Sequence, residues 1–460
     1  MNREPYQQKA LDLFSSGVNI ALYGPGGCGK SFTLEEIINS GKRVLALAPT
    51  GKAALNLHET AMTIHSFLSI GASSLNAHNW EKVKKKIRKV KNNIINKLKE
   101  YDVIVIDEFT MIYGGLLDTF CKMLLEFTGY LWGNKQIILS FDCLQLQPIK
   151  PKELYEYTAE KLEGVDYVLN TDNFQRLIPF ENIIYFDNNR RTKNLYFNTL
   201  LLNARLGNLN SDDLIYLNKR TISNVLEADS KFGENMLYTS LKNQDCIEWN
   251  THKLNSILKP IYEFDREIIC SEDDFYSKFD NKDELKKIKL YNECIKYMDE
   301  LGGYTSNFKY KVGARVMCRT NIYKDNKIIN GSLGEIVEIK DNIIFVQYDN
   351  GITIEHELIN WEHPDHGKLI RAYPLILAWG ITTHKLQGST IKDVKLVVNT
   401  GMSRNGSYMS HLLYVAISRV NDPENLYIIS DDSITNKFFP VDNNMFKWHT
   451  NYYNYLYKLL

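Results

Sequence analysis

The stretch Ile20-Ala-Leu-Tyr-Gly-Pro-Gly-Gly-Cys-Gly-Lys-Ser31 decides the fold, because it joins a short apolar run to a glycine-rich loop. Residues 24–31 fit the pattern GxxxxGK(S/T), and Phe32–Asn39 can form a helix after it. A strand, a glycine loop and a helix in this order predict a phosphate site at a helix N-terminus. The candidate nucleotide-binding residues here are Gly24, Pro25, Gly26, Gly27, Cys28, Gly29, Lys30, Ser31 and Phe32.

A pair of carboxylates complements this loop. Val103–Ile106 is another apolar run, and Asp107 and Glu108 follow it directly. With a phosphate loop of this type, such an aspartate holds Mg²⁺ and the adjacent glutamate can orient or deprotonate water. Lys30 can reach the β- and γ-phosphates, and Ser31 can ligate the metal. We therefore predict ATP and Mg²⁺ as cofactors, with Ser31 and Asp107 at the metal.

Further apolar runs extend the α/β pattern. In the first third of the chain they include Val44–Ala48 and Ile137–Ser140, with helical patterns between them. Runs of four or five residues that are apolar on both faces are typical of buried parallel strands. A later group comprises Leu375–Ile381, Val394–Val398 and Leu426–Ile429. This grouping predicts an α/β fold with two layers.

Two other segments have a different character. Short strands joined by Asp341-Asn342 and by Asn350-Gly351 predict hairpins of a small antiparallel barrel inserted in the second layer. Residues 263–300 are charged and helical in tendency, and we expect a solvated helical excursion there. Residues 82–99 hold nine Lys or Arg beside an apolar stripe. Their basic face is either simply solvated or turned toward phosphates.

The bulk composition limits the function classes. The 460 residues contain 55 Lys or Arg and 55 Asp or Glu, so any nucleic-acid contact must use local patches. Seven cysteines without a CxxC pair are typical of reduced thiols in an intracellular protein. No apolar run reaches membrane-spanning length, and the first residues resemble neither a signal peptide nor a mitochondrial presequence. We expect an intracellular location: cytoplasm, nucleoid, nucleus or a viral replication site.

Taken in order, the motifs resemble those of superfamily-one helicases of the Pif/RecD/Dda type. The matching segments are Tyr6-Gln7, the glycine loop, and residues 48–54, 63–67, 106–111, 141–148, 189–191, 204–207, 383–390 and 414–419. They cover almost the whole chain. Two positions depart from the family pattern: Phe141 stands where a glycine is usual, and Leu386 stands where a small polar residue is usual.

The resemblance implies roles for further residues. Gln7 would read adenine, Gln145 would sense the γ-phosphate, and Gly388 would lie near the nucleotide. Arg191 and Arg419 would be the two catalytic arginines, acting with Lys30, Asp107 and Glu108. The implied contacts with single-stranded DNA are made by Thr50, His65, Phe67, Thr382, His384 and Lys385.

The family's architecture implies two RecA-like P-loop layers. The first would span 1–185, with 71–100 as a basic, wedge-like helical insertion. The second would span 186–320 and 372–460, with 321–371 as an inserted SH3-like β-barrel.

The implied function is an ATP-dependent DNA helicase moving 5′-to-3′ on single-stranded DNA, in replication, repair or recombination. Its expected partners are single strands and single-strand/duplex junctions, and also RNA–DNA hybrids or G-quadruplexes, with no membrane and a monomeric chain. An ATP-gated nucleic-acid clamp that hydrolyses slowly without unwinding remains the alternative. A P-loop kinase or small-molecule ATPase is disfavoured, because it would need neither the late arginines nor the cluster Thr383–Thr390.

Overall fold

The computed structural model describes residues 3–68, 80–112, 114–145, 168–272, 307–320, 326–363, 367–386, 393–401 and 412–458, with isolated positions between these ranges. The chain forms two compact units. One comprises Met1–Asn243 with Ile381–Leu460, and the other comprises Gln244–Gly380.

The first unit contains a six-stranded parallel sheet in the order β3-β2-β4-β5-β1-β6. Its strands are β1 (Ile20–Tyr23), β2 (Val44–Ala48), β3 (Met62–Thr63), β4 (Val103–Ile106), β5 (Gln136–Phe141) and β6 (Ile183–Tyr185). Every residue of β1 and of β4 is buried, as expected for a parallel sheet covered on both faces. We call this sheet and its helices the first layer.

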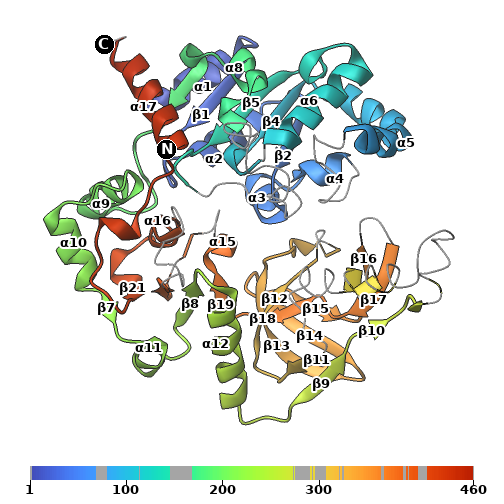
Figure 1. Ribbon diagram of the computed structural model, residues 1–460, viewed down its shortest axis with the longest axis vertical. Coiled ribbons are helices and arrows are strands. Elements are labelled where there is room, and N and C mark those ends of the chain that lie inside the picture. Colours follow the sequence, from blue (N-terminus) through green and yellow to red (C-terminus); the bar gives the residue numbers. More distant parts are fainter. Residues whose placement is uncertain are drawn as a thin grey trace. The chain divides into compact units, whose positions relative to one another are not determined.

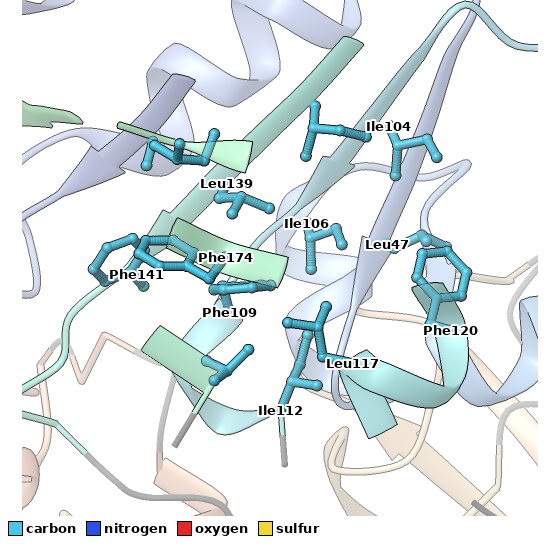
Figure 2. Packing of buried hydrophobic residues seen from close by; sticks show 14 of the residues in the cluster. Leu47, Ile104, Ile106, Phe109, Ile112, Leu117, Phe120, Leu139, Phe141 and Phe174 are labelled. Carbon is cyan, nitrogen blue, oxygen red and sulfur yellow. The ribbon is translucent and has the colours of Figure 1, made fainter. Parts of the chain in front are cut away.

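Helices cover both faces of this sheet (Figure 1). They are α1 (Pro5–Ser15), α2 (Lys30–Ile38), α3 (Gly51–Leu57), α4 (Ile64–Leu68), α5 (Trp80–Lys99), α6 (Gly114–Thr128) and α8 (Asp172–Leu177). One face packs against α1 and α2 through Phe14 and Leu34. The other face buries a cluster that includes Ile106, Phe109 and Phe120 (Figure 2).

The basic segment forms the helix α5, as its apolar spacing predicted. Ile94 and Leu98 are buried in the core of the first layer, and Val90 packs partly against it. The C-terminal half of α5 is therefore docked by its apolar stripe. The side chains of residues 80–89, which include most of the basic cluster, lie outside the described part.

The second predicted α/β layer is also present in the first unit. Its sheet has the order β19-β8-β20-β21-β7. The strands are β7 (Thr221–Ile222), β8 (Met236–Ser240), β19 (Gly380–Thr382), β20 (Lys395–Asn399) and β21 (Leu426–Ile429). β8, β20, β21 and β7 pair in parallel. The accompanying helices are α9 (Leu195–Arg205), α10 (Ser211–Asn218), α11 (Val225–Phe232), α15 (Thr383–Leu386) and α16 (Leu412–Ile417).

The last helix, α17 (Asn443–Tyr457), connects the second layer back to the first (Figure 1). It begins at Asp442, whose side chain accepts hydrogen bonds from two backbone N–H groups of the first turn. Trp448 and Tyr452 join the hydrophobic core of the first layer. The Trp448 ring meets the Phe141 ring edge-on at 5.6 Å. The aromatic Phe141, unusual for the family at that position, is thus part of the contact that holds α17.

The apolar run Leu375–Ile381, which we expected in the second layer, is divided between two sheets. Its first part forms β18 (Leu375–Leu377), which pairs antiparallel with β12 (Arg315–Cys318) in the second unit. Its last residues belong to β19. Apolarity predicted strands here, but it did not indicate that the chain passes from one unit to the other.

The second unit begins with α12 (Asn243–Ser256) and is otherwise antiparallel in its described sheets. One sheet has the order β15-β14-β13-β12-β18, another has β10-β17-β16, and β9 pairs with β11. The remaining bounds are β9 (Tyr262–Asp265), β10 (Glu267–Ile268), β11 (Asn307–Tyr310), β13 (Leu333–Lys340), β14 (Ile343–Tyr348), β15 (Thr353–His356), β16 (Ile359–His363) and β17 (Gly367–Ala372).

The predicted hairpin at Asp341-Asn342 is present, with φ angles of 50° and 62° at the two turn residues. The boundaries expected for the insertion, 321 and 371, cut through this unit, because β12 and β18 pair within the same sheet as β13. The helical excursion expected at 263–300 is wrong at its start, since residues 262–268 form β9 and β10. Most of the remainder lies outside the described residues.

Two expectations about the whole chain can be compared with the structure. All seven cysteines lie among the described residues, where each is buried and reduced. Within the described ranges, no helix combines the length and the hydropathy needed to cross a bilayer.

Candidate active site

The glycine loop lies between β1 and α2, where the sequence placed it. Gly24 has a φ of 157°, and a Cβ atom added to it would lie 2.1 Å from the backbone oxygen of Phe186. Gly27 has a φ of 84°, and its Cβ would lie 2.6 Å from Asn189 Oδ1. Only glycine fits at these two points, so the loop can follow a tight path that leads its N–H groups to the start of α2.

Lys30 is the first residue of α2, and its ammonium folds back over the loop. Its Nζ donates hydrogen bonds to the carbonyls of Gly24 at 2.6 Å and of Pro25 at 2.8 Å. Ser31 is exposed in the same first turn, and Phe32 is 44% exposed. Cys28 is buried, and its thiol donates to the Pro25 carbonyl at 2.9 Å. The loop therefore holds a cation at its centre and a hydroxyl at its rim, a donor set that fits a phosphate chain and its metal.

Asp107 and Glu108 follow β4, and both carry raised pKa values. Burial raises the pKa of Asp107. Burial and the Asp107 charge raise the pKa of Glu108, while Lys30 and Arg419 act in the opposite direction. Glu108 also has a φ of 49°, a backbone conformation that non-glycine residues rarely adopt. Two neighbouring carboxylates in a desolvated place fit a divalent cation, whose charge would offset both.

The segment predicted to sense phosphate follows β5. Gln145 is 4% exposed, and its Nε2 donates to Asp142 Oδ2 at 3.0 Å. Its Oε1 accepts from Arg419 Nη2 at 3.5 Å. This contact joins a residue of the first layer to a residue of the second.

Both predicted arginines also reach this point, Arg191 from the segment between β6 and α9, and Arg419 from just after α16. Arg191 Nη1 donates to the Ser418 carbonyl at 2.6 Å, and burial followed by the Arg419 charge lowers the pKa of Arg191 to about 9. Arg419 is 2% exposed and donates to the Val415 carbonyl and to Ser418 Oγ, each at 2.9 Å. Burial lowers the pKa of Arg419. Neither arginine has a carboxylate among these hydrogen-bond acceptors, so both are held as desolvated cations.

The glycine loop shows how closely these groups converge. A Cβ on Gly26 would lie 3.1 Å from Gln145 Nε2, 3.3 Å from Arg191 Nη1 and 3.3 Å from Arg419 Nη2. The structure therefore brings together three residues that are 46 to 274 positions apart from one another in the sequence (191 − 145 and 419 − 145).

Gln7 lies behind the loop and is 1% exposed. Its Oε1 accepts from the Glu4 N–H at 3.0 Å, and its Nε2 donates to Thr33 Oγ1 at 3.3 Å. Beside it, the Tyr6 and Phe186 rings lie 4.6 Å apart. This part of α1 can offer an amide and flat apolar surface to a nucleotide base.

The predicted DNA-binding residues have more varied positions. Thr50 is exposed, and its hydroxyl caps α3 by accepting from the Ala53 N–H at 3.2 Å. Phe67 is fully buried in the first-layer core, 6.3 Å from the Phe120 ring. This placement does not support stacking of Phe67 on a base. The backbone of His65 belongs to α4, but its side chain lies outside the described part.

The late polar cluster begins as the short helix α15, which packs against α16. Thr382 and His384 are half-buried, and burial lowers the pKa of His384. The Thr383 hydroxyl contacts the Thr239 hydroxyl at 3.2 Å. Leu386 is 1% exposed, which explains an apolar residue at this position. Since α16 leads directly to Arg419, only α16 separates α15 from the residues predicted to bind nucleotide. Gly388 lies outside the described residues.

Sequence reasoning gave no role to Asp142, Arg205, Tyr23, His449 and Ser418. Arg205 forms a buried ion pair with Asp142, with 2.6 Å between Nη2 and Oδ1. Ser418 supplies its carbonyl to Arg191 and its hydroxyl to Arg419. Asp142 and Arg205 both lie inside matched motifs. Because they are 63 residues apart in the sequence, no local pattern indicates that they pair.

Comparison with known proteins shows which helicases this chain is similar to. A family model described as PIF1-like helicase matches residues 6–213. The ATP-dependent DNA helicase Pif1 of Bdellovibrio bacteriovorus is 26% identical over 435 residues, covering 92% of this chain and 87% of that protein. The Campylobacter jejuni protein of the same name is 27% identical, covering 94% of each chain.

The fold is similar to solved structures over nearly the whole chain. The crystal structure of Bacteroides Pif1 bound to ssDNA has a TM-score of 0.76 at 24% identity, covering 99% of this chain and 98% of that one. A Pif1 structure described as the basis for unwinding of forked dsDNA has the same score, identity and coverage. At this identity the similarity shows the shared architecture of two RecA-like layers.

Proposed function

We propose that the chain is a PIF1-like helicase and that it converts ATP hydrolysis into movement along one DNA strand. It is an ATP-dependent DNA helicase. The observation that carries this function is the convergence on Gly26 of Gln145 from the first layer with Arg191 and Arg419. Catalytic groups on both sides of the nucleotide allow hydrolysis to depend on closure of the two layers, as movement along a strand requires.

The chain's own residues would hold the nucleotide as follows. The loop N–H groups and Lys30 would bind the phosphates, and the Gln7 amide would face the base. Ser31 and Asp107 would hold Mg²⁺, which when bound neutralises charge on the phosphates. Lys30, which donates to the Gly24 and Pro25 carbonyls, would exchange these bonds for phosphate oxygens. This rearrangement needs only a rotation of its side chain.

Hydrolysis would then depend on groups already in place. Glu108 and Gln145 would orient the attacking water, and the raised pKa of Glu108 suits a group that accepts a proton near neutral pH. Arg191 and Arg419 would stabilise charge on the transferred phosphoryl group, an effect worth about 10³–10⁵ in rate. Since Arg419 follows α16 of the second layer, hydrolysis would require the two layers to be close together. Phosphate release would remove the attraction and let them separate.

We propose that single-stranded DNA contacts both layers, so that closing and opening become steps. Thr50 and His65 would contribute from the first layer, and Thr382, His384 and Lys385 from the second. Related Pif1 structures contain ssDNA and forked dsDNA, and we infer single strands and junctions as substrates here. The proposed direction is 5′-to-3′. RNA–DNA hybrids and G-quadruplexes are further proposed substrates, and junction unwinding would serve replication, repair or recombination.

One chain carries both sides of this site, so we propose a monomeric motor. The direction can be tested with oligonucleotides that carry biotin–streptavidin at either the 3′ or the 5′ end. ATP should speed displacement of streptavidin from the 3′ end, where a 5′-to-3′ motor arrives. Faster displacement only from the 5′ end would refute the direction. DNA-stimulated hydrolysis with no displacement from either end would favour the ATP-gated clamp.

A further inference from the structure

A buried network lies behind the phosphate sensor and is formed by Asp142, Arg205, Tyr23 and His449. Arg205 and Asp142 are each 1% exposed. Arg205 Nη2 lies 2.6 Å and Nε lies 3.0 Å from the same carboxylate oxygen, Asp142 Oδ1. Burial alone would raise the pKa of Asp142, but the charge and hydrogen bonds of Arg205 keep this pKa below its ordinary value. The pair is therefore an ionised contact fixed at two donor atoms.

Tyr23 extends this network to the C-terminal helix. Its hydroxyl accepts from Arg205 Nη2 at 3.0 Å and lies within hydrogen-bond distance of His449 Nδ1 and of the Cys143 thiol. Because burial lowers the pKa of His449 to about 4, the imidazole is neutral and its Nδ1 can accept a hydrogen bond from the Tyr23 hydroxyl. The Cys143 thiol can donate to the Met445 carbonyl instead. The Tyr23 hydroxyl and the Cys143 thiol then each have an acceptor.

Asp142 also fixes the sensor itself. Its Oδ2 accepts from Gln145 Nε2 at 3.0 Å, and its Oδ1 accepts from the Leu144 N–H at 3.1 Å. The backbone carbonyl of Asp142 accepts from Thr110 Oγ1 at 3.2 Å, just beyond the Asp107–Glu108 pair. With Nε2 turned to the carboxylate, the Gln145 amide must present Oε1 to Arg419. The other amide orientation would place an oxygen against the Asp142 carboxylate.

We propose that Arg205 is a positioning residue for ATP hydrolysis, which acts by holding Asp142 so that Gln145 keeps one amide orientation. This inference rests on the proposed ATPase function of the site. Arg205 ends α9, which packs against α16, the helix that leads to Arg419. A shift of the second layer therefore moves Arg205 and Arg419 together. Arg205 transmits this shift to Gln145 through Asp142, without touching the nucleotide itself.

A double-mutant cycle tests this route. Arg205→Lys keeps the charge but cannot donate from two nitrogens, and Gln145→Ala removes the group that Arg205 is proposed to orient. Arg205→Lys should lower kcat for DNA-stimulated hydrolysis by about 10–100-fold, with the Kd for a fluorescent ATP analogue changed by less than about threefold. In the Gln145→Ala background the same substitution should cost about twofold or less. Equal losses in both backgrounds would overturn the proposal.

Two controls separate this role from general effects on folding. Arg220→Lys alters an arginine that pairs with Glu424 and lies over the Tyr216 ring, and it should leave kcat unchanged. If Arg205→Lys does not fold, the paired variant Arg205→Met with Asp142→Leu removes both buried charges, a change that often preserves stability. This folded variant should show the same loss in kcat, and a wild-type kcat would overturn the proposal.

The hydrolysis rate of the wild-type protein separates failure of the proposed function from failure of the role of Arg205. Without DNA-stimulated hydrolysis in the wild type, the proposed function itself fails. With a normal wild-type rate and independent losses in the cycle, only the role of Arg205 fails.

Discussion

Replacing Arg419 with alanine should reduce hydrolysis strongly while changing the free energy of unfolding little. The guanidinium is buried, and its hydrogen-bond acceptors are the neutral Val415 carbonyl, Ser418 Oγ and Gln145 Oε1. Its pKa is lowered by burial, so the folded state bears a cost for keeping this charge desolvated. A group that is costly to bury without a carboxylate hydrogen-bond acceptor is typical of a functional site.

The magnitudes follow from these contacts. A lost arginine at a phosphoryl transition state lowers the rate by about 10³–10⁵, or roughly 4–7 kcal/mol of barrier. Each hydrogen bond from the charged Arg419 to a neutral acceptor contributes about 1.5–3 kcal/mol to folding, and removing the desolvated charge offsets much of this loss. We therefore expect a change in unfolding free energy within about 2 kcal/mol. Arg205→Ala, the matched buried arginine, should cost about 3–5 kcal/mol, because it leaves the Asp142 charge unpaired.

The assay combines three measurements on each variant: single-turnover phosphate release with single-stranded DNA, equilibrium binding of a fluorescent ATP analogue, and urea unfolding followed by circular dichroism. For Arg419→Ala we expect binding within about threefold of wild type, together with the large loss in rate. Retention of more than about a tenth of the wild-type rate would refute the catalytic role. So would a rate loss accompanied by the destabilisation expected for Arg205→Ala, since the defect would then lie in folding.

Four other variants test separate parts of the site. Lys30→Ala should abolish turnover without unfolding the protein, because the ammonium donates to groups of the loop itself, the Gly24 and Pro25 carbonyls and the Cys28 sulfur; turnover near wild type would remove Lys30 from the phosphate site. Gly26→Ala should lower kcat by about 10²-fold with the fold intact, because its methyl group meets the ends of three functional side chains; an unchanged kcat would show that these groups have no fixed catalytic geometry. Lys385→Ala should lower DNA-stimulated turnover more than basal turnover, whereas equal losses would place α15 in folding or nucleotide binding only. Neutralising Lys84, Lys85, Lys86 and Lys89 should weaken DNA binding and reduce its salt dependence; an unchanged salt slope would leave α5 as a solvated face.

Local patterns predicted the parts of the fold that depend on neighbouring residues. The sequence indicated β1, β4 and the loop that ends at Ser31, because each depends on a pattern only a few residues long. The two strands are apolar on both faces, and the loop has a characteristic glycine spacing. β8 was missed because its sequence, Met-Leu-Tyr-Thr-Ser, mixes apolar and hydroxyl residues, although three of the five are buried. Strand identity there depends on β20, more than 150 residues later.

The same limit applies to the site. Phe67 and a base-stacking phenylalanine have the same local signature, and only the Phe120 contact shows that this ring belongs to the core. The boundary at 321 was placed before the hairpins, whereas β12 joins their sheet across an intervening loop. Asp142 and Arg205 lay inside motifs, where they only helped to establish the order of the motifs along the chain. Their ion pair joins distant segments, so no sequence pattern indicates it.

The most direct test of the whole account is strand separation of a forked duplex by the wild-type protein and by Lys30→Ala, followed by the fluorescence of a labelled strand. With ATP and Mg²⁺, the wild type should release the strand from a fork with a 5′ tail, and Lys30→Ala should bind the fork without releasing it. Hydrolysis of ATP by the wild type on the fork, with the duplex left intact, would contradict the account.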